Sequence, residues 1–193
     1  MKVAAICALA AALALPALPQ TLKTRPGNSP ADALQRKLDT IRRNSAHAIR
    51  SPITTDLPEG EVNAWLASSY AQLPKGVRSL HLTGLDGRVT ADAKVDFDEF
   101  TGGVGSNPLL AIFRGVHDVQ VIATGHATGG EATLHTESVT LDGVTIPTMV
   151  LEFFVERYVQ PRYPNVGIDS HFTPGYHVDS ARVGAHVLTV VQK

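Results

Sequence analysis

The segment GVTIPTMVLEFFVERYVQPRYP, residues 143–164, carries a dense set of large apolar side chains. Pro147 is typical of a helix start, and Pro161 and Pro164 are typical of a helix stop. When residues 146–160 are placed on a helical wheel, the polar side chains share one narrow arc: Glu152, Glu156 and Gln160, with Arg157 at its edge. Nearly all other positions are apolar, and a helix of that kind is buried on most of its sides. The segment therefore predicts a long apolar helix that the rest of the protein encloses.

Strand alternation is clearest over residues 88–98, where apolar and polar side chains change places at every step. A period of two predicts a strand with one buried face and one solvated face. The apolar side chains of this stretch are Val89, Ala91, Ala93, Val95 and Phe97. Asp86-Gly87 joins it to residues 77–85 as a hairpin, because glycine supplies the positive φ that such turns require.

A second hairpin is predicted for residues 117–141, with its turn at Thr128-Gly129-Gly130. On its first strand the apolar residues share one face: Val119, Val121 and Ala123. On its return strand the apolar residues change parity, from Ala132 and Leu134 to Val139 and Leu141. A β-bulge near Thr136–Ser138 accounts for the change, because one extra residue restores the original face and bends the strand.

Two helices are predicted ahead of these strands. The first is capped by Ser29, with Pro30 at its first position and Asp32 completing a capping box. The second runs from about Glu59 to Tyr70, after a short extended piece. Near the C-terminus, a turn at Pro174-Gly175 and an alternating run predict a last strand pair; the run is Val183, Ala185, Val187, Thr189 and Val191.

The order of these elements predicts an α+β fold: a twisted, bulged, mostly antiparallel sheet wrapped around the long apolar helix, with two N-terminal helices. Residues 30–193 are expected to form this single domain. Inward-facing alanines would leave an incompletely filled groove between helix and sheet; the alternative is an ordinary filled core. The expected ligand-binding residues are apolar side chains of the strands and the helix: Val89, Ala91, Ala93, Val95, Phe97, Val121, Ala123, Met149, Val150, Phe153 and Phe154.

Residues 1–20 have the pattern of a secretory signal peptide, with Lys2 before an apolar run, Val3 to Leu15, and small residues near the candidate cleavage sites. The run is too short to span a bilayer. Residues 21–29 are a polar spacer that contains proline and glycine. The sole cysteine, Cys7, lies in the signal, so neither disulfides nor thiol chemistry are expected in the mature chain.

The charge balance is close to neutral, with 17 basic and 18 acidic residues and a formal charge of −1. A nucleic-acid-binding domain usually carries a clear basic excess, so no nucleic-acid partner is expected. The same balance lacks the surplus of Lys and Arg that anchors proteins on anionic membranes.

Catalytic and metal-binding patterns are weak. The eight histidines, among them His117, His126 and His135, lack the spacings of zinc sites, and exposed strand histidines are the simpler interpretation. No G-x-S-x-G motif is present, and TGGVGSN (101–107) is not followed by the helix and Lys of a phosphate loop. We therefore expect neither an enzyme nor a cofactor or metal site.

Three features together resemble a known family. They are EGEVNAWL (59–66) after a short strand, VRSLHLTGLDGRVTADAKVDF (77–97) as a hairpin, and the closing run from VTLDGVTIPTMVLEFFVERY (139–158) to FTPGYHVDSARVGAHVLTV (172–190). The chain resembles the LmeA-like exported phospholipid-binding proteins, relatives of the tubular lipid-binding (TULIP) superfamily. The resemblance implies a twisted sheet around a long helix and a groove for a lipid acyl chain. The Gly-rich loop at 102–105 and the many histidines depart from the family pattern.

The leading hypothesis is an exported, non-enzymatic binding protein for phospholipid or another long apolar ligand, acting in lipid transport or envelope maintenance. It would work in the periplasm or cell envelope and allows a transient contact with a membrane. One alternative is an envelope scaffold or protein-interaction domain with a filled core. A second is a hydrolase or metal-dependent enzyme that uses the histidines.

Overall fold

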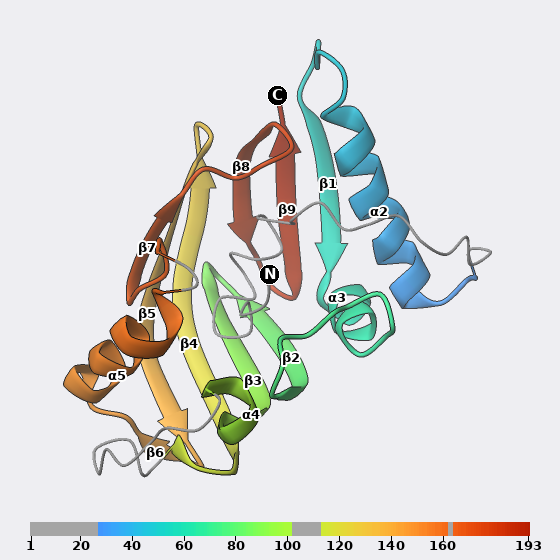
Figure 1. Cartoon of the computed structure of the whole chain (residues 1–193). Coiled ribbons are helices and arrows are strands. Elements are labelled where there is room, and N and C mark those ends of the chain that lie inside the picture. Colours follow the sequence, from blue (N-terminus) through green and yellow to red (C-terminus); the bar gives the residue numbers. More distant parts are fainter. Residues whose placement is uncertain (1–26, 102–112, 162–163) are drawn as a thin grey trace.

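The computed structural model describes residues 27–101, 113–161 and 164–193. In this part of the chain, nine strands form a single sheet in which every pair is antiparallel (Figure 1). One path of neighbours runs through six strands: β1 (Ile53–Pro58), β9 (Val187–Gln192), β8 (Val178–Val183), β4 (Val116–Thr128), β3 (Arg88–Asp96) and β2 (Val77–Leu85). The others are β5 (Glu131–Leu141), which pairs with β4, and β6 (Val144–Thr145) and β7 (Asp169–Phe172), which pair with β5. The predicted α+β class with a large antiparallel sheet is confirmed.

The helices of the described residues are short and lie between or before the strands. They are α2 (Pro30–Asn44), α3 (Glu59–Leu66), α4 (Phe97–Thr101), α5 (Thr148–Phe154) and a π-helical turn, η2 (Val155–Val159), that directly continues α5. Ser29 caps α2: its Oγ accepts from the Asp32 N–H, and the Asp32 carboxylate accepts from the Ser29 N–H. α3 ends four residues before the predicted Tyr70, because the Ser68 hydroxyl bonds the Trp65 carbonyl and the Tyr70 N–H.

β4 is the long central strand of the sheet. Its residues 116–124 pair with β3, and further along the same edge His126 and Ala127 pair with β8. The β2–β3 and β8–β9 hairpins therefore lie end to end beside β4, and their tips are joined. Gly87 N–H donates to the Val183 carbonyl at 2.8 Å, and His186 N–H donates to the Gly84 carbonyl at 2.8 Å.

The predicted bulge on β5 is confirmed. Ile122 faces Ser138 while the next residue, Ala123, faces Thr136, so Glu137 is the extra residue. The bulge returns the later apolar residues to the buried face, and all four are buried: Ala132, Leu134, Val139 and Leu141. Two further register shifts, on β2 and β8, bend the sheet as well.

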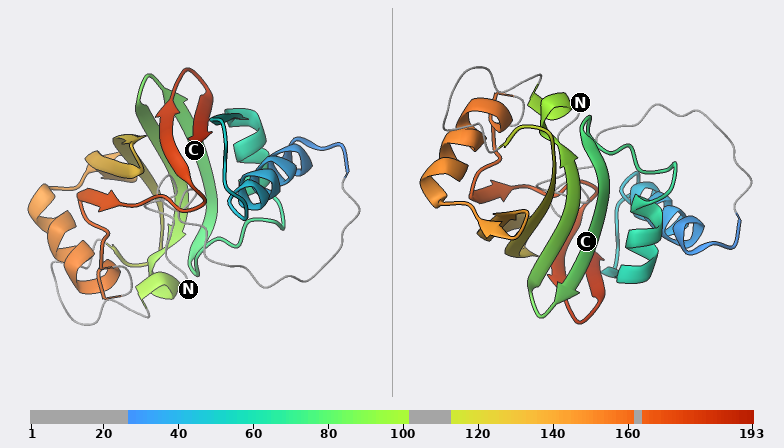
Figure 2. Two further views of the ribbon diagram at one scale, coloured as in Figure 1. Left: turned by 90° about the horizontal axis from the view of Figure 1, so that it is seen from above. Right: turned by 90° about the horizontal axis from the view of Figure 1, so that it is seen from below.

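Two groups of helices cover opposite ends of one sheet face. The larger apolar cluster joins β2–β5 to α5 and η2, and the smaller one joins β1, β8 and β9 to α2. Val121 belongs to the larger cluster and Ala127 to the smaller, and their even spacing on β4 places both on the same face. Figure 2 shows α5 and the α2–α3 pair standing at opposite ends of the molecule.

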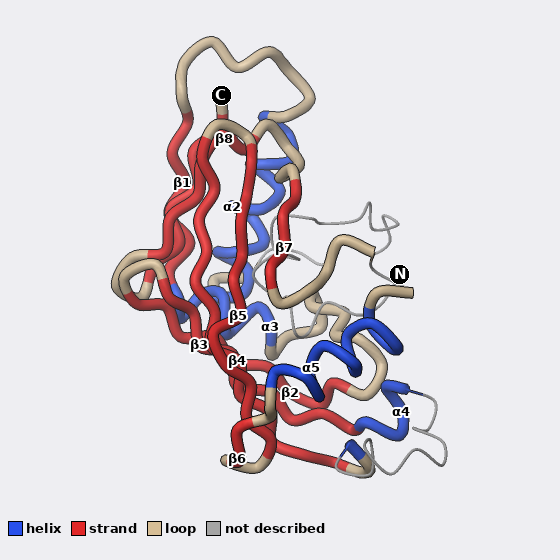
Figure 3. Tube along the Cα trace, turned by 90° about the vertical axis from the view of Figure 1, so that its left-hand side faces the viewer, coloured by secondary structure: helices blue, strands red, loops and turns tan. Residues whose placement is uncertain are grey.

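The sheet does not wrap around α5. The helix packs its Leu151 and Phe154 side against the sheet, but Met149 is 79% exposed and Phe153 is 40% exposed on its outer side. Figure 3 shows α5 lying along the margin of the sheet, beyond β5 and β6. The prediction of a helix enclosed on most sides is therefore wrong. The apolar outer face of α5 does not by itself determine which part of the chain packs against it. The strand before it in the described residues, β6, is only two residues long.

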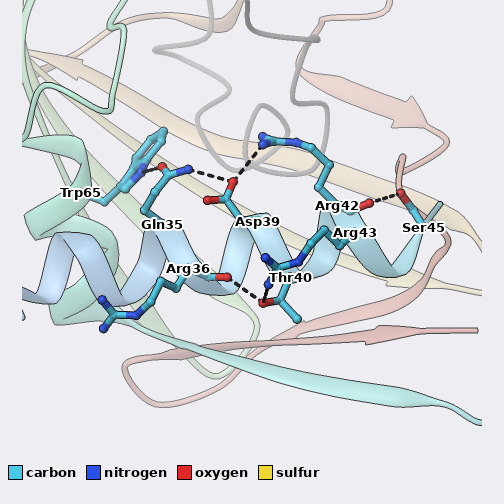
Figure 4. Close-up of polar contacts among 8 residues, drawn as sticks. All are labelled: Gln35, Arg36, Asp39, Thr40, Arg42, Arg43, Ser45 and Trp65. Carbon is cyan, nitrogen blue, oxygen red and sulfur yellow. Dashed lines mark hydrogen bonds and ion pairs between the residues drawn. The ribbon is translucent and has the colours of Figure 1, made fainter. Parts of the chain in front are cut away.

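The α2–α3 pair is held by a polar chain that Figure 4 shows in detail. Trp65 Nε1–H donates to Gln35 Oε1 at 2.8 Å, and Gln35 Nε2 donates to Asp39 Oδ1 at 3.1 Å (Figure 4). Arg42 contacts the same carboxylate oxygen at 3.0 Å. These bonds fix the orientation of α3, whose other side meets the edge of β2.

Asn63 of α3 takes the place of a neighbouring strand beside β2. Its Nδ2 donates to the Leu82 carbonyl at 2.8 Å, and its Oδ1 accepts from the Leu82 N–H at 2.8 Å. Glu59 Oε2 accepts from the next edge amide that points the same way, Gly84 N–H, also at 2.8 Å. Two helix side chains thus satisfy a sheet edge that would otherwise pair with another chain.

We expect Asn63→Ala to lower the free energy of unfolding by about 1–3 kcal/mol, because a backbone donor and acceptor lose their partners together. Urea unfolding followed by circular dichroism measures this. Ser69→Ala, at an exposed position just after the same helix, is the control and should stay within about 0.5 kcal/mol of the parent. Equal stability of Asn63→Ala and the parent would mean that Asn63 does not hold the edge.

Candidate functional site

Four aromatic side chains form the centre of the candidate site, between α5–η2 and the sheet. The Phe113 and Phe154 ring centroids are 4.5 Å apart, and each lies within 6 Å of the Phe97 ring, at 5.3 Å and 5.7 Å. Tyr158 of η2 adds a ring 5.2 Å from Phe154. Tilted and edge-on pairs of this kind are favourable beyond the area that they bury. Phe97 starts α4 and Phe113 precedes β4, so the cluster joins three parts of the chain.

The structure brings most of the predicted ligand-binding residues together beneath this cluster. Those that are buried on the helix-covered face or in the cluster itself are Val89, Ala91, Val95, Phe97, Val121, Ala123 and Phe154. Ala93 and Val150 pack against the same cluster and are partly buried. All of these except Ala123 belong to, or pack against, the larger apolar cluster, which also contains Leu151 of α5.

Met149 and Phe153 are the two exceptions. They were expected to face the sheet, but both lie on the outer side of α5 and are exposed. Val144, in β6 just before the helix, is 67% exposed. Three large apolar side chains within one short stretch therefore face solvent, which is uncommon for a helix beside a core and typical of a binding surface.

Small residues of β4, β5 and β8 lie on the sheet between the two apolar clusters. A pocket of about 20 Å³ lies there, lined among others by Gly125, Ala127, Ala132 and Ala181. That volume suits a water molecule rather than a ligand, for which sites of several hundred Å³ are usual. Gly125 has no room for a side chain, since a Cβ would lie 2.9 Å from Leu134 Cδ1. The alternation of β4, continued beyond Ala123, predicts that Gly125 and Ala127 lie on the same face of the sheet. No comparable sequence pattern points to Ala181.

His117 touches the candidate site, with its ring 5.9 Å from that of Phe97, whereas the predicted pair His126 and His135 lies away from it. His126 and His135 are exposed on the other face of the sheet, and the register sets them diagonally rather than opposite each other. His135 Nδ1 contacts Asp169 Oδ1 at 2.6 Å. Within the residues that the structure describes, no three His, Cys, Asp or Glu side chains are grouped so as to hold a metal ion.

Charged side chains at the α4 end of the site are paired. Arg78 contacts Asp96 at 2.8 Å and Glu99 at 3.2 Å. The hydrogen bond from Arg78 lowers the pKa of the Asp96 carboxyl below its ordinary value. This pairing favours the ionised form of Asp96. The apolar part of the site would bind a ligand by excluding water.

The sequence matches no protein-family model, no curated protein and no solved structure. In the described part of the chain, none of the helices has the length and apolar character needed to cross a membrane.

Proposed function

We propose that this protein binds a lipid, or another molecule with a long apolar chain, along α5 and the neighbouring sheet face, without converting it chemically. The observation that carries the proposal is the outer face of α5, where Met149 and Phe153 are exposed one turn apart. The inner face of the same helix continues into the buried aromatic cluster. A ligand bound beside α5 would therefore contact the exposed Met149 and Phe153 side chains and lie next to the buried apolar cluster.

The energetics favour such a ligand. Fully burying a Met or Phe side chain is worth about 1.5–3 kcal/mol relative to leaving it in water. Because Met149, Phe153 and Val144 are exposed, the unliganded protein does not gain much of this free energy of burial. A bound apolar chain would gain it and would complete the enclosure of the helix that the sequence pattern predicts. In this view the ligand, together with the bent sheet, covers α5.

An elongated ligand fits the surface better than a compact one. The apolar face of β4 runs from Val119 in the larger cluster to Ala127 in the smaller, a length of about 27 Å at the rise of a strand. The residues between the clusters are small, but the pocket beside them is only about 20 Å³, so a chain that entered there would have to displace the side chains that bury this face. The family resemblance and the predicted signal peptide support an exported lipid-binding protein of the periplasm or cell envelope.

The test combines ligand recovery with matched variants. Native mass spectrometry and lipid extraction of protein purified from a membrane-containing host should recover bound lipid, and a fluorescent fatty acid should bind the delipidated protein. Met149→Ser with Phe153→Ser should weaken probe binding by about tenfold or more, because two apolar contacts are lost. Glu152→Ala on the same helix is the control and should bind as the parent does. Ligand-free protein that also ignores the probe would refute the proposal.

The second candidate is an envelope scaffold or protein-interaction domain with a filled core. The favouring observation is that most predicted ligand-binding residues of the sheet are already buried by the protein's own side chains, and that the pocket beside Gly125 and Ala127 is only about 20 Å³. The exposed face of α5 would then meet a protein. Recovery of a stoichiometric protein partner, lost in the Met149→Ser/Phe153→Ser variant, together with lipid-free protein, would favour this function.

A further inference from the structure

We propose that His117 is a pH-sensitive latch that joins the turn before β4 to the turn before α5 when its imidazole is protonated and frees one of the two when the ring is neutral. The proposal rests on the proposed function, since the turn carries the helix that would admit the ligand. The latch would set how readily α5 yields to an incoming apolar chain.

Both ring nitrogens of His117 face acceptors. Nδ1 lies 2.6 Å from Asp142 Oδ2, and Nε2 lies 2.6 Å from the Arg114 carbonyl oxygen. A carboxylate and a carbonyl accept hydrogen bonds and do not donate them. A neutral imidazole has only one N–H, so it can satisfy one of the two contacts. Both hydrogen bonds can form at the same time only when both ring nitrogens of His117 are protonated.

Asp142 connects the latch to α5. Its other oxygen, Oδ1, accepts from Asp118 N–H at 2.9 Å, and its own N–H donates to the Asp118 carbonyl at 2.8 Å. Asp142 has a positive φ of 50° and is followed by Gly143 at 81°, so the turn from β5 to β6 depends on an unfavoured backbone conformation. Ile146 and α5 follow directly. Side-chain bonds to Asp142 therefore stabilise the start of the helical segment.

The opposite side of the ring connects to the aromatic cluster. The Arg114 carbonyl belongs to the turn before β4, and the following Gly115 donates to Asp98 Oδ2 at 3.1 Å and accepts from Phe97 N–H at 2.9 Å. The Phe97 ring meets the imidazole edge-on, with centroids 5.9 Å apart. One side chain thus ties the turn before α5 to the α4 side of the candidate site.

The charges around the ring favour its protonated form. Asp142, in the turn after β5, and Asp118, on β4, act on the ring, and Lys94 is held by Asp118 at 2.6 Å. The carboxylate of Asp98, on α4, accepts from Gly115 N–H, two residues before His117. Partial burial opposes the charge, but the bonds to Asp142 and the Arg114 carbonyl outweigh it and raise the pKa of His117 above its ordinary value. The bond from His117 in turn lowers the pKa of Asp142.

These directions fix the pH window of the latch. A raised pKa in the folded state means that the stabilisation from His117 is complete below the ordinary histidine value of about 6.5 and is lost as pH rises through the folded value. The lowered pKa of Asp142 means that its contribution is complete above about 3.9 and is lost only in stronger acid. The latch is therefore closed below about pH 6.5 and opens as pH rises through the raised pKa of His117.

Hydrogen exchange tests the latch without any ligand. The variant is His117→Gln, with Asp142→Asn as a second variant that keeps the turn's shape, and His135→Gln is the control because it breaks an equally short but exposed contact to Asp169. In mild acid, amides of residues 144–154 should exchange about tenfold faster in His117→Gln than in the parent at the same pH. The difference should vanish at alkaline pH, and His135→Gln should match the parent throughout.

Probe binding then separates the latch from the proposed function. If the fluorescent fatty acid binds, its association with the parent should speed up with rising pH, whereas His117→Gln should be fast at every pH. An unchanged exchange ratio in both His117→Gln and Asp142→Asn, or an equal effect of His135→Gln, would overturn the latch even if the probe binds. If the probe fails to bind the parent, the proposed function falls, and the exchange data still decide whether the latch exists.

Discussion

Phe154→Ala is expected to lower the free energy of unfolding by about 3–5 kcal/mol, one of the two largest effects that the structure predicts. The side chain is 1% exposed, and its ring packs against those of Phe97, Phe113 and Tyr158. Removing it leaves a cavity at the only place where α4, the turn before β4 and η2 meet through rings, among the described residues. Those parts of the chain are far apart in sequence, so the cavity cannot close by a local shift. Urea unfolding, monitored by tyrosine and tryptophan fluorescence, measures the loss.

The matched control is the adjacent residue. Phe153→Ala removes the same group from the outer face of α5, where the ring is 40% exposed, and should cost about 1 kcal/mol or less. The Phe153→Asp variant should also fold. If α5 were enclosed on most sides, as the sequence predicts, an aspartate at this position would prevent folding. Equal losses in Phe153→Ala and Phe154→Ala would mean that α5 is rotated about its axis, with Phe153 rather than Phe154 facing the sheet.

The strands could be predicted from sequence because their signal is short-ranged and has a simple period. The alternation around Val89 and Val95 fixes which face is buried whatever the strand pairs with. The bulge at Glu137 is equally readable, because two apolar sets of opposite parity can face the same core only if one extra residue separates them. Much of the candidate site follows from this, since its floor is the buried face of those strands.

The surroundings of α5 could not be predicted in the same way. Its pattern shows that nearly every side is apolar, but burial also needs a neighbour, and neighbours come from the topology of the whole sheet. Met149 is 79% exposed although its neighbours in the pattern, Leu151 and Phe154, are buried, and no local pattern separates them. The His117–Asp142 pair poses a similar problem, because it joins residues that are 25 positions apart.

The last strand shows how a polar residue can mislead. The alternating set at its end is Val187, Thr189 and Val191, yet the most buried side chains of β9 are Val190 and Gln192. A glutamine at the end of a chain is usually exposed. Gln192 is buried because backbone groups from two distant segments converge on it, a fact that no local pattern contains.

Gln192→Leu should lower the free energy of unfolding by about 2–4 kcal/mol, although leucine has a similar size and is more apolar. Gln192 is 0% exposed, and its Nε2 donates to the carbonyls of Ile41, at 2.9 Å, and Tyr176, at 2.6 Å. Its Oε1 accepts from Asn44 at 3.0 Å. Leucine would remove all three hydrogen bonds from a buried position, and the Ile41 carbonyl would keep a longer bond from Ser45 N–H, at 3.3 Å. A buried acceptor that loses a partner costs more than the bond itself was worth.

The loss should be concentrated in two places, which gives the prediction a second readout. Ile41 lies in the last turn of α2, where its carbonyl accepts one other bond, from Ser45 N–H at 3.3 Å. Tyr176 and His177 are consecutive residues with positive φ, 61° and 55°. Without Gln192 the turn at Tyr176–His177 loses a bond that holds this strained backbone, so limited proteolysis should cut there first. Thr189→Val, which removes one exposed hydrogen bond to Asp56 from the same strand, should cost about 1 kcal/mol or less and leave the cleavage pattern unchanged. If Gln192→Leu is as stable as Thr189→Val, packing rather than hydrogen bonding holds α2 to the sheet, because the apolar contacts of Leu34 and Val190 would then suffice without the glutamine.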